Sequence, residues 1–172
     1  YATAIDYLAG FCRNGLIQPQ DSETRAFLHD IPVAAGFDTE SLSEALKERN
    51  CAIIRDMGIT ARGKDPAEAY VNFSAACFAC FVKFFSDTLR ESRTGGIEKA
   101  RAKAFSDACR YLPGLAEYDG TLKRGPFETG DQARKAIIEA GKEVVGRGLV
   151  NACFGNISYR LGNTLYITAS GS

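Results

Sequence analysis

The sequence has little of several residue types that particular functions require. It contains a single histidine, His29, no tryptophan, and 21 basic against 21 acidic side chains, which leaves no formal net charge. A zinc site built from three imidazoles is therefore excluded for this chain by itself. The charge balance provides no general attraction to nucleic acid or to an anionic membrane. No apolar run approaches the roughly 20 residues of a membrane-spanning helix, and no secretory signal is visible, so we expect neither nucleic acid nor membrane as a partner.

Cysteine is the exception to this scarcity. Six cysteines occur, mostly among apolar neighbours, at positions 12, 51, 77, 80, 109 and 153. Thiols in such surroundings are typical of the interior of a protein in a reducing compartment, so we expect a cytoplasmic location. Cys77 and Cys80 have the spacing of a redox or metal motif. They lie in a phenylalanine-rich helical stretch with no second cysteine pair, so core thiols are the better interpretation.

The most informative stretch is the last one, residues 148–172. Ile157, Tyr159 and Leu161 alternate with polar residues, and Gly162-Asn163 separates them from a second extended run at 165–168, which predicts a tight β-hairpin. The hairpin brings the turn at 154–156 near the turn at 169–171. Turns rich in glycine, asparagine and serine expose N–H groups and can cradle a phosphate or another anion. Two ordinary turns that bound a hairpin are the alternative.

The length suits one ordinary domain of mixed α/β content. Residues 1–11 have apolar positions at helical spacing, and the polar residues 18–25 predict a loop. Residues 29–33 predict an extended segment. A helix is expected next at 42–49, with Leu42, Ala45 and Leu46 facing inward. Strands are expected at 51–55 and 59–61 around a turn at 56–58. Asp65-Pro66 is a strong helix start. This helix is expected to run to about residue 89, with its apolar stripe at Tyr70, Phe73, Cys77, Phe81 and Phe84/Phe85. A connecting helix from about 97 to 108 and a long surface linker should follow. The last expected helix covers 133–145, with Ala133, Ile137, Ala140 and Val144 on one face.

Two pieces of the chain resemble the class II aldolase/adducin family, of the fuculose-phosphate-aldolase type. The first is Gly155-Asn156-Ile157-Ser158 followed by Ile167-Thr168-Ala169-Ser170-Gly171, which is similar to the opening of the family's domain. The resemblance implies phosphate or substrate binding by Gly155, Asn156, Ser170 and Gly171, with Ala169 in place of the usual proline. It also implies a central, mostly antiparallel β-sheet flanked by helices on both faces.

The second piece, from residue 31 to about 89, resembles the C-terminal half of the same family, so the two halves stand in inverted order. The matching residues are Ile31-Pro32, Leu42, Leu46, Ile53-Ile54, Gly58, Gly63 and Glu68-Ala69. We therefore expect the C-terminal half of one aldolase-like domain at 1–89, a linker with a connecting helix at 90–129, and the N-terminal part of such a domain at 130–172. A cut from a tandem protein, a circularly permuted domain and a genuine deletion all remain possible origins.

The family uses a divalent metal, usually zinc, held by three histidines, with a carboxylate that moves the proton. In the family's order, the acid/base glutamate and two of the histidines belong to the segment that this chain lacks. The third histidine corresponds to Met57, a poor zinc ligand. Asp56 beside it does not define a site, and His29, with Asp30 next to it, is interpreted as a surface or loop residue. The resemblance implies zinc, but the ligands in this chain do not support it, and no catalytic residue is assigned.

Three functions follow from the resemblance. On the first, the chain is expected to be part of a metal-dependent aldehyde-lyase that acts on a sugar phosphate or a related hydroxy-carbonyl compound, with the metal ligands outside this chain. Alternatively, it is a non-catalytic, adducin-like scaffold, or a module that binds a phosphorylated ligand without turnover. The resemblance also implies a small phosphorylated substrate and a homo-oligomer.

Overall fold

The computed structural model describes residue 5, residues 15–110, residue 120, residues 122–150 and residues 155–169. The chain divides into two compact units, Tyr1–Leu112 and Pro113–Ser172. Each unit is described by itself below. The expected first helix at residues 1–11 lies outside the described residues, apart from Ile5.

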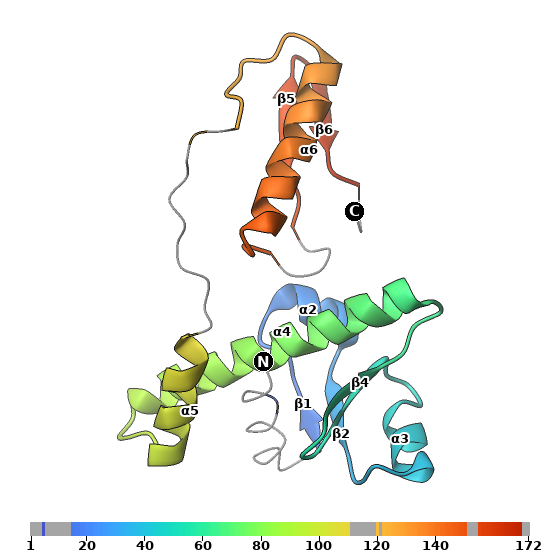
Figure 1. The fold of residues 1–172 in the computed structure, drawn as a ribbon, viewed down its shortest axis with the longest axis vertical. Helices are drawn as coiled ribbons and strands as arrows, with labels where there is room; N and C mark the ends of the chain where they lie inside the picture. The colour runs from blue at the N-terminus through green and yellow to red at the C-terminus, as the bar shows by residue number, and fades with distance from the viewer. Residues whose placement is uncertain (1–4, 6–14, 111–119, 121, 151–154, 170–172) are drawn as a thin grey trace. The chain divides into compact units, whose positions relative to one another are not determined.

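The first unit is built on a four-stranded sheet in the order β1-β2-β3-β4 (Figure 1). Its strands are β1 (Leu16–Ile17), β2 (Ile31–Ala34), β3 (Cys51–Ile54) and β4 (Gly58–Ala61). β1 pairs antiparallel with β2, β2 pairs parallel with β3, and β3 pairs antiparallel with β4. The sheet is therefore mostly antiparallel, and the mixed α/β class expected from the sequence is confirmed.

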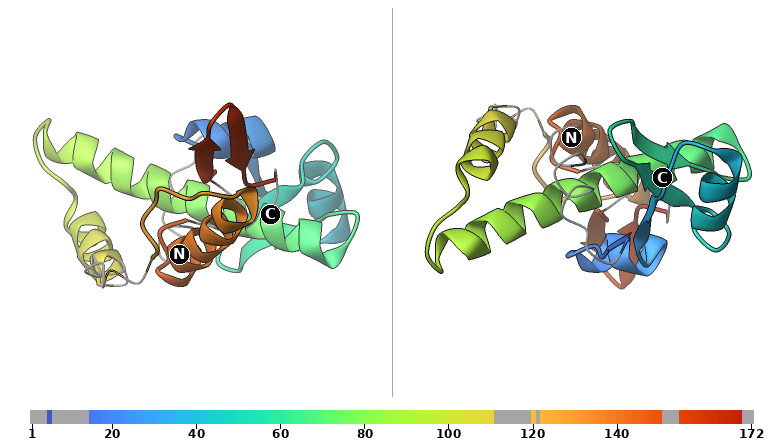
Figure 2. Two further views of the ribbon diagram at one scale, coloured as in Figure 1. Left: turned by 90° about the horizontal axis from the view of Figure 1, so that it is seen from above. Right: turned by 90° about the horizontal axis from the view of Figure 1, so that it is seen from below.

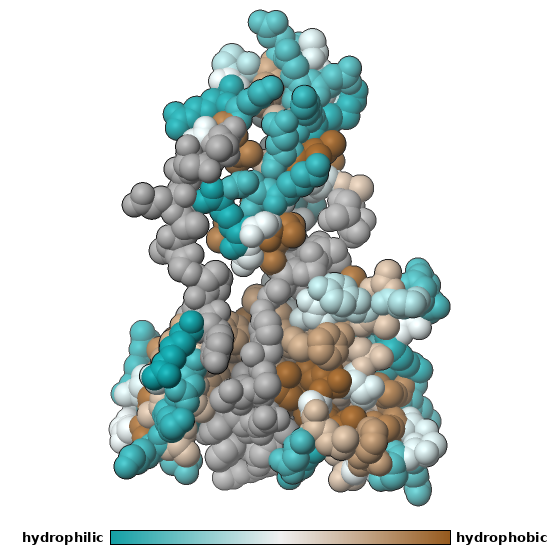
Figure 3. Space-filling model, in the orientation of Figure 1, coloured by the Kyte–Doolittle hydropathy of each residue, from teal (hydrophilic) through white to brown (hydrophobic). Residues whose placement is uncertain are grey.

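Helices cover both faces of this sheet. All four residues of β3 are buried, including Ala52 and Ile53, which point to opposite faces. The long helix α4 (Pro66–Ser92) packs on β3 and β4, and α3 (Thr39–Ala45) packs on β2. The views in Figure 2 show α4 crossing this unit from end to end. Figure 3 shows hydrophobic residues gathered over the strands of this unit, with hydrophilic residues around them. The core of the unit thus lies between α4 and the sheet.

Two helices of the first unit begin where the sequence did not place them. α2 (Ser22–Leu28) lies mostly within the expected loop at 18–25, because Asp21 caps it by accepting a hydrogen bond from Thr24 N at 2.7 Å. α3 begins at Thr39 rather than 42, because Asp38 accepts from Ser41 N at 2.8 Å. None of its residues is fully buried, so the inward-facing residues expected there are only half-buried.

The buried face of α4 corrects a second expectation. Its most buried positions are small, namely Ala75, Ala76, Ala79 and Cys80, with Phe84 at the far end. Tyr70 and Phe73 were expected on the apolar stripe, but their exposed fractions are 67% and 43%. Small side chains on the buried face allow close packing against α4, and Tyr70 and Phe73 lie outside that face, whereas Phe84 is buried as expected.

α4 is also long and apolar enough to cross a membrane by length and composition, which the sequence reasoning missed. One such helix is weak evidence for a membrane protein, because core helices of soluble proteins meet the same criterion. Asn72, Ser74, Lys83 and Ser86 interrupt its apolar residues. Among the described residues, α4 is the one helix that meets this criterion.

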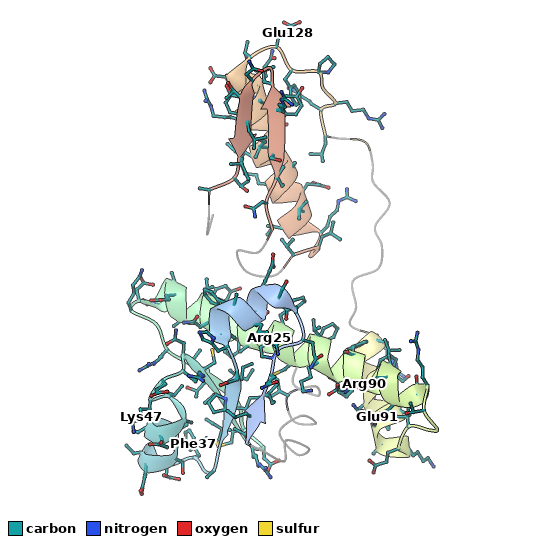
Figure 4. All side chains as sticks on the ribbon, turned by 180° about the vertical axis from the view of Figure 1, so that it is seen from behind. Arg25, Phe37, Lys47, Arg90, Glu91 and Glu128 are labelled. Carbon is teal, nitrogen blue, oxygen red and sulfur yellow. The ribbon has the colours of Figure 1, made fainter. Side chains whose placement is uncertain are left out.

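The last helix of the first unit, α5 (Lys99–Cys109), is attached to α4 by a buried arginine. Arg101 is 6% exposed and donates from Nε to Thr88 Oγ1 at 3.0 Å, while its Nη1 pairs with Glu91. Thr88 in turn donates to Phe84 O at 2.7 Å. Figure 4 shows Glu91 at the C-terminal end of α4, beside α5. The connecting helix expected at 97–108 is confirmed.

The second unit contains α6 (Gly130–Gly146) and a hairpin of β5 (Ser158–Leu161) and β6 (Thr164–Ile167). Thr129 caps α6 in a capping box with Gln132, and Gly148, with φ 65°, follows the helix end. Ala133 and Ile137 are buried against the hairpin. Leu161 pairs with Thr164 across Gly162, whose φ is 59°, so the predicted hairpin and its two-residue turn are confirmed.

Candidate functional site at the open end of the hairpin

The open end of the hairpin is closed by hydrogen bonds between its two strands. Thr168 N donates to Ile157 O at 3.0 Å, and Ile157 N donates to Thr168 Oγ1 at 3.2 Å. Thr168 Oγ1 donates in turn to Asn156 Oδ1 at 3.5 Å. We call the corner formed by Gly155, Asn156 and Thr168 the hairpin mouth. The turn before the hairpin and the residue that ends it therefore meet.

Several hydrogen-bond donors at the hairpin mouth bond to no acceptor among the described residues. The backbone N–H groups of Gly155 and Asn156 and the side-chain NH₂ of Asn156 have no acceptor within the described part of the chain. Both residues are exposed, and Gly155 has φ 93°, a conformation that favours glycine. Exposed N–H and NH₂ donors at a glycine-containing turn can bind the oxygens of an anion.

The structure places only part of the predicted phosphate-binding set. Gly155 and Asn156 lie at the hairpin mouth, whereas Ser170 and Gly171 lie outside the described residues. Thr168, two residues before Ser170, is a member of this corner that the sequence reasoning did not single out. The hairpin register contained the signal, because a two-residue turn that pairs Leu161 with Thr164 must also place Ile157 opposite Thr168.

α6 holds the hairpin mouth in position from one side. A side chain built at Gly141 would meet Ile157 Cδ1 at 3.8 Å, and one built at Gly155 would meet Val150 Cγ1 at 3.5 Å. The mouth therefore lies near the C-terminal half of α6 and the segment that leaves it. A helix C-terminus carries partial negative charge, so attraction for an anion has to come from the donors of the mouth itself.

The residues that correspond to the family's metal turn do not form a metal site. Asp56 and Met57 are exposed, with Met57 at 61%, and Asp56 takes a positive φ of 60° in the tight turn between β3 and β4. His29 is exposed and ends α2. No group of three histidine, cysteine or carboxylate side chains suited to a metal occurs among the described residues. The donor set at this turn, one carboxylate beside a thioether, does not fit zinc.

The described cysteines are free thiols, and their surroundings are those of core residues rather than of a redox pair. Cys51, Cys77 and Cys80 are free and buried, and Cys109 is free and half-buried. Burial raises the pKa of the Cys51 and Cys80 thiols to about 12 and also raises that of Cys77. Cys51 donates through Sγ to Asn72 O at 3.1 Å. Thiols this hard to ionise are poor nucleophiles, which agrees with a structural role. Cys12 and Cys153 lie outside the described residues.

Each unit also contains a cavity that the sequence did not indicate. In the first unit, a cavity of about 700 Å³ lies between β2 and α3 and includes the Asp30–Arg49 pair, joined at 2.7 Å and 3.1 Å. In the second, a cavity of about 500 Å³ lies between residues 123–128 and the first half of α6. Glu128, labelled in Figure 4, is one of the residues that line it. Lys123, Arg124 and Lys135 line the second cavity and form no ion pair with any described residue.

Comparisons with known proteins add a distant likeness to a solved structure. No family model matches the sequence, and no curated protein matches it. Among solved structures, the L-fuculose-1-phosphate aldolase from Thermus thermophilus is similar, with a TM-score of 0.41 and 20% sequence identity. The match covers 56% of this chain and 53% of that one, so it spans about half the length of the aldolase. A likeness at this level establishes neither family membership nor function.

Proposed function

We propose that this chain is part of a class II aldolase-type protein and that its hairpin mouth holds the phosphate of a small phosphorylated substrate. The sequence supports this through the residues Gly155-Asn156-Ile157-Ser158 and Ile167-Thr168-Ala169-Ser170-Gly171. The single observation that carries the proposal is the bond from Thr168 Oγ1 to Asn156 Oδ1, because it joins the two motif segments at one corner.

Asn156 has the central role in this proposal. Its carbonyl oxygen accepts from Thr168, which turns the NH₂ end of the same amide away from that hydroxyl. The NH₂ group and the adjacent backbone N–H groups then serve as neutral donors to phosphate oxygens. Ser170 and Gly171 would add a hydroxyl and further N–H donors. A site made of neutral donors binds through hydrogen bonds to a charged acceptor, each contributing about 1.5–3 kcal/mol.

The reaction proposed for the whole protein is cleavage of a sugar phosphate or a related hydroxy-carbonyl compound by a metal-dependent aldehyde-lyase. In this proposal the chain contributes ligand binding, and no group of side chains suited to a metal occurs among the described residues. The metal ligands and the proton-transferring carboxylate would come from outside this chain. The cytoplasmic location expected from the thiols is part of the same proposal.

The competing proposal is a non-catalytic module, either an adducin-like scaffold or a phospho-ligand-binding domain. The exposed Met57 in the position of a metal-binding histidine favours it for the first unit. Turnover separates the two proposals. Retro-aldol activity toward sugar phosphates, lost on chelation, supports the lyase, whereas binding of the same compounds without turnover or metal supports the module.

Phosphate binding itself is tested with two matched asparagine variants. We expect Asn156→Ala to weaken binding of inorganic phosphate or a sugar phosphate by about tenfold, equivalent to about 1.4 kcal/mol. Asn163→Ala at the opposite end of the same hairpin should leave binding unchanged. Equal affinities of both variants and the parent chain would remove the hairpin mouth as the phosphate site.

A further inference from the structure

The cavity of the second unit has a wall that is fixed by contacts of the segment before α6. Phe127 N donates to Tyr159 Oη at 3.1 Å, and the centroids of the two rings lie 4.9 Å apart. Gly125 passes so close to the same tyrosine that a Cβ there would meet Tyr159 Oη at 3.2 Å. From the helix, Gln132 Oε1 accepts from Glu128 N at 2.9 Å. This wall of the cavity is therefore attached to both β5 and α6.

Three cationic side chains reach the cavity from two elements. Lys123 and Arg124 come from the segment before the helix, and Lys135 comes from the second turn of α6. All three are exposed, and none of them pairs with a carboxylate among the described residues. Arg134, the neighbour of Lys135 in sequence, does pair with Asp131. The described part of the chain thus leaves three positive charges without a paired carboxylate at one cavity.

Gln132 adds a neutral donor to the same lining. Its Oε1 is taken by the capping box, where it accepts from the backbone N–H groups of Glu128 and Thr129. A glutamine amide also carries two N–H donors, and those of Gln132 bond to no acceptor among the described residues. The residue lies in the first turn of α6, where the helix dipole adds to the attraction for an anion. The donors that face a ligand here are therefore both charged and neutral.

Two carboxylates oppose this attraction. Glu128 and Glu139 line the same cavity, and neither forms an ion pair with Lys135 or with another described cation. Glu139 lies one turn beyond Lys135, about 6 Å farther along the helix axis. The lining carries three positive and two negative charges, an excess of one. Because this excess is small, direct contacts with the cations, rather than diffuse attraction, have to hold a ligand.

We propose that this cavity binds a small organic anion with two or more acidic groups, either phosphate or carboxylate. Its volume of about 500 Å³ lies within the range of small-molecule sites, roughly 300–1,000 Å³. Cations on two elements can each contact a different acidic group, and the guanidinium of Arg124 suits bidentate contact with phosphate or carboxylate. Pro126, Phe127 and Ala136 supply apolar surface for the carbon skeleton. The site is separate from the hairpin mouth, which lies near the C-terminal half of α6.

Titrations of the parent chain with pyrophosphate and with citrate, followed through backbone amide shifts, test the proposal. We expect saturable shifts at Gln132 and Lys135 with at least one probe, and the tighter probe identifies the acidic group. Orthophosphate offers a single group and should bind the cavity about fivefold more weakly. The amides of Gly155 and Asn156 report the hairpin mouth separately in the same spectra. No saturable shift at the cavity with either probe, or equal affinity for orthophosphate, would overturn the proposal.

Charge variants distinguish contacts inside the cavity from general attraction to the chain. Lys135→Gln and Arg124→Gln should each weaken the tighter probe about fivefold, and Glu139→Gln should strengthen it. Lys142→Gln is the matched control, because Lys142 is exposed on the same helix and does not line the cavity. Equal losses for the Lys135 and Lys142 variants would contradict the proposal. An unchanged amide spectrum without ligand checks folding, and if one of the two cavity variants fails to fold, the other decides.

Discussion

The ring of Tyr166 lies directly against the backbone of Gly130, so that a Cβ at residue 130 would fall 2.9 Å from the ring carbon Cζ. Arg134 lies over the same ring, with its Cζ 5.6 Å from the centroid. The first turn of α6 and β6 can therefore pack this closely only because residue 130 is glycine and has no side chain.

We predict that Gly130→Ala destabilises the second unit. The added methyl group forces Tyr166 to move from a close contact, which typically costs about 1–3 kcal/mol. Gly146→Ala is the control, because a Cβ there meets nothing within 4 Å and alanine favours a helix. Thermal unfolding should show a lower midpoint for the first variant and an equal or higher one for the second. Equal midpoints for the Gly130 variant and the parent would contradict this packing.

A second prediction concerns Asn72, which joins α4 to the end of β4. It is 1% exposed, donates from Nδ2 to Arg62 O at 2.7 Å, and accepts from Cys51 Sγ through its backbone. Asn72→Ala removes the donor to Arg62 O and should lower the free energy of unfolding by about 1–3 kcal/mol. Asn50→Ala, which removes only an exposed contact of 3.4 Å to Arg62 Nε, should change it little. Denaturant titration of both variants distinguishes the two cases.

A third prediction follows from the buried thiols. Burial raises the pKa of Cys51 and Cys80 to about 12, whereas a thiol in the unfolded chain ionises near 9.0. The folded state therefore binds more protons than the unfolded state between these values, so the free energy of unfolding should fall as pH rises from 9 toward 12. The Cys51→Ala/Cys80→Ala double variant should show a shallower fall. Parallel stability curves for the variant and the parent would mean that these thiols do not cause the dependence.

A fourth prediction concerns the attachment of α5. Arg101→Ala removes the buried donor to Thr88 and the partner of Glu91, so α5 should lose hydrogen-exchange protection relative to α4. Lys103→Ala breaks only a pair between exposed groups on α5 and should leave protection unchanged. If α5 remains as protected in the Arg101 variant as in the parent, the aromatic contact of Phe85 with Phe105, 4.7 Å between centroids, suffices to hold it.

Local signals in the sequence were enough to predict much of the second unit. Gly162 at a two-residue turn fixes the hairpin register, and the spacing of Ala133 and Ile137 identifies the buried face of α6. The same signals failed in the first unit where tertiary packing decides. Helical spacing of large apolar residues placed Tyr70 and Phe73 on the buried stripe of α4, whereas the fully buried residues next to them are the small Ala75 and Ala76.

The candidate site was only partly predictable for a different reason. The motif identified Gly155 and Asn156, but Thr168 was found only from the strand register that sets it opposite Ile157. The cavity lined by Lys123, Arg124 and Lys135 joins an irregular segment to a helix face, and no local pattern connects those residues. The division into family-like halves at residues 89 and 130 remains a prediction.

The most direct test of the central claim is a titration of the parent chain with inorganic phosphate, followed through backbone amide chemical shifts. The account predicts saturable shifts at Gly155 and Asn156, with Gly162 and Asn163 at the far end of the hairpin unaffected. Shifts confined to Lys123, Arg124 and Lys135, or no saturable shift at Gly155 and Asn156, would contradict it.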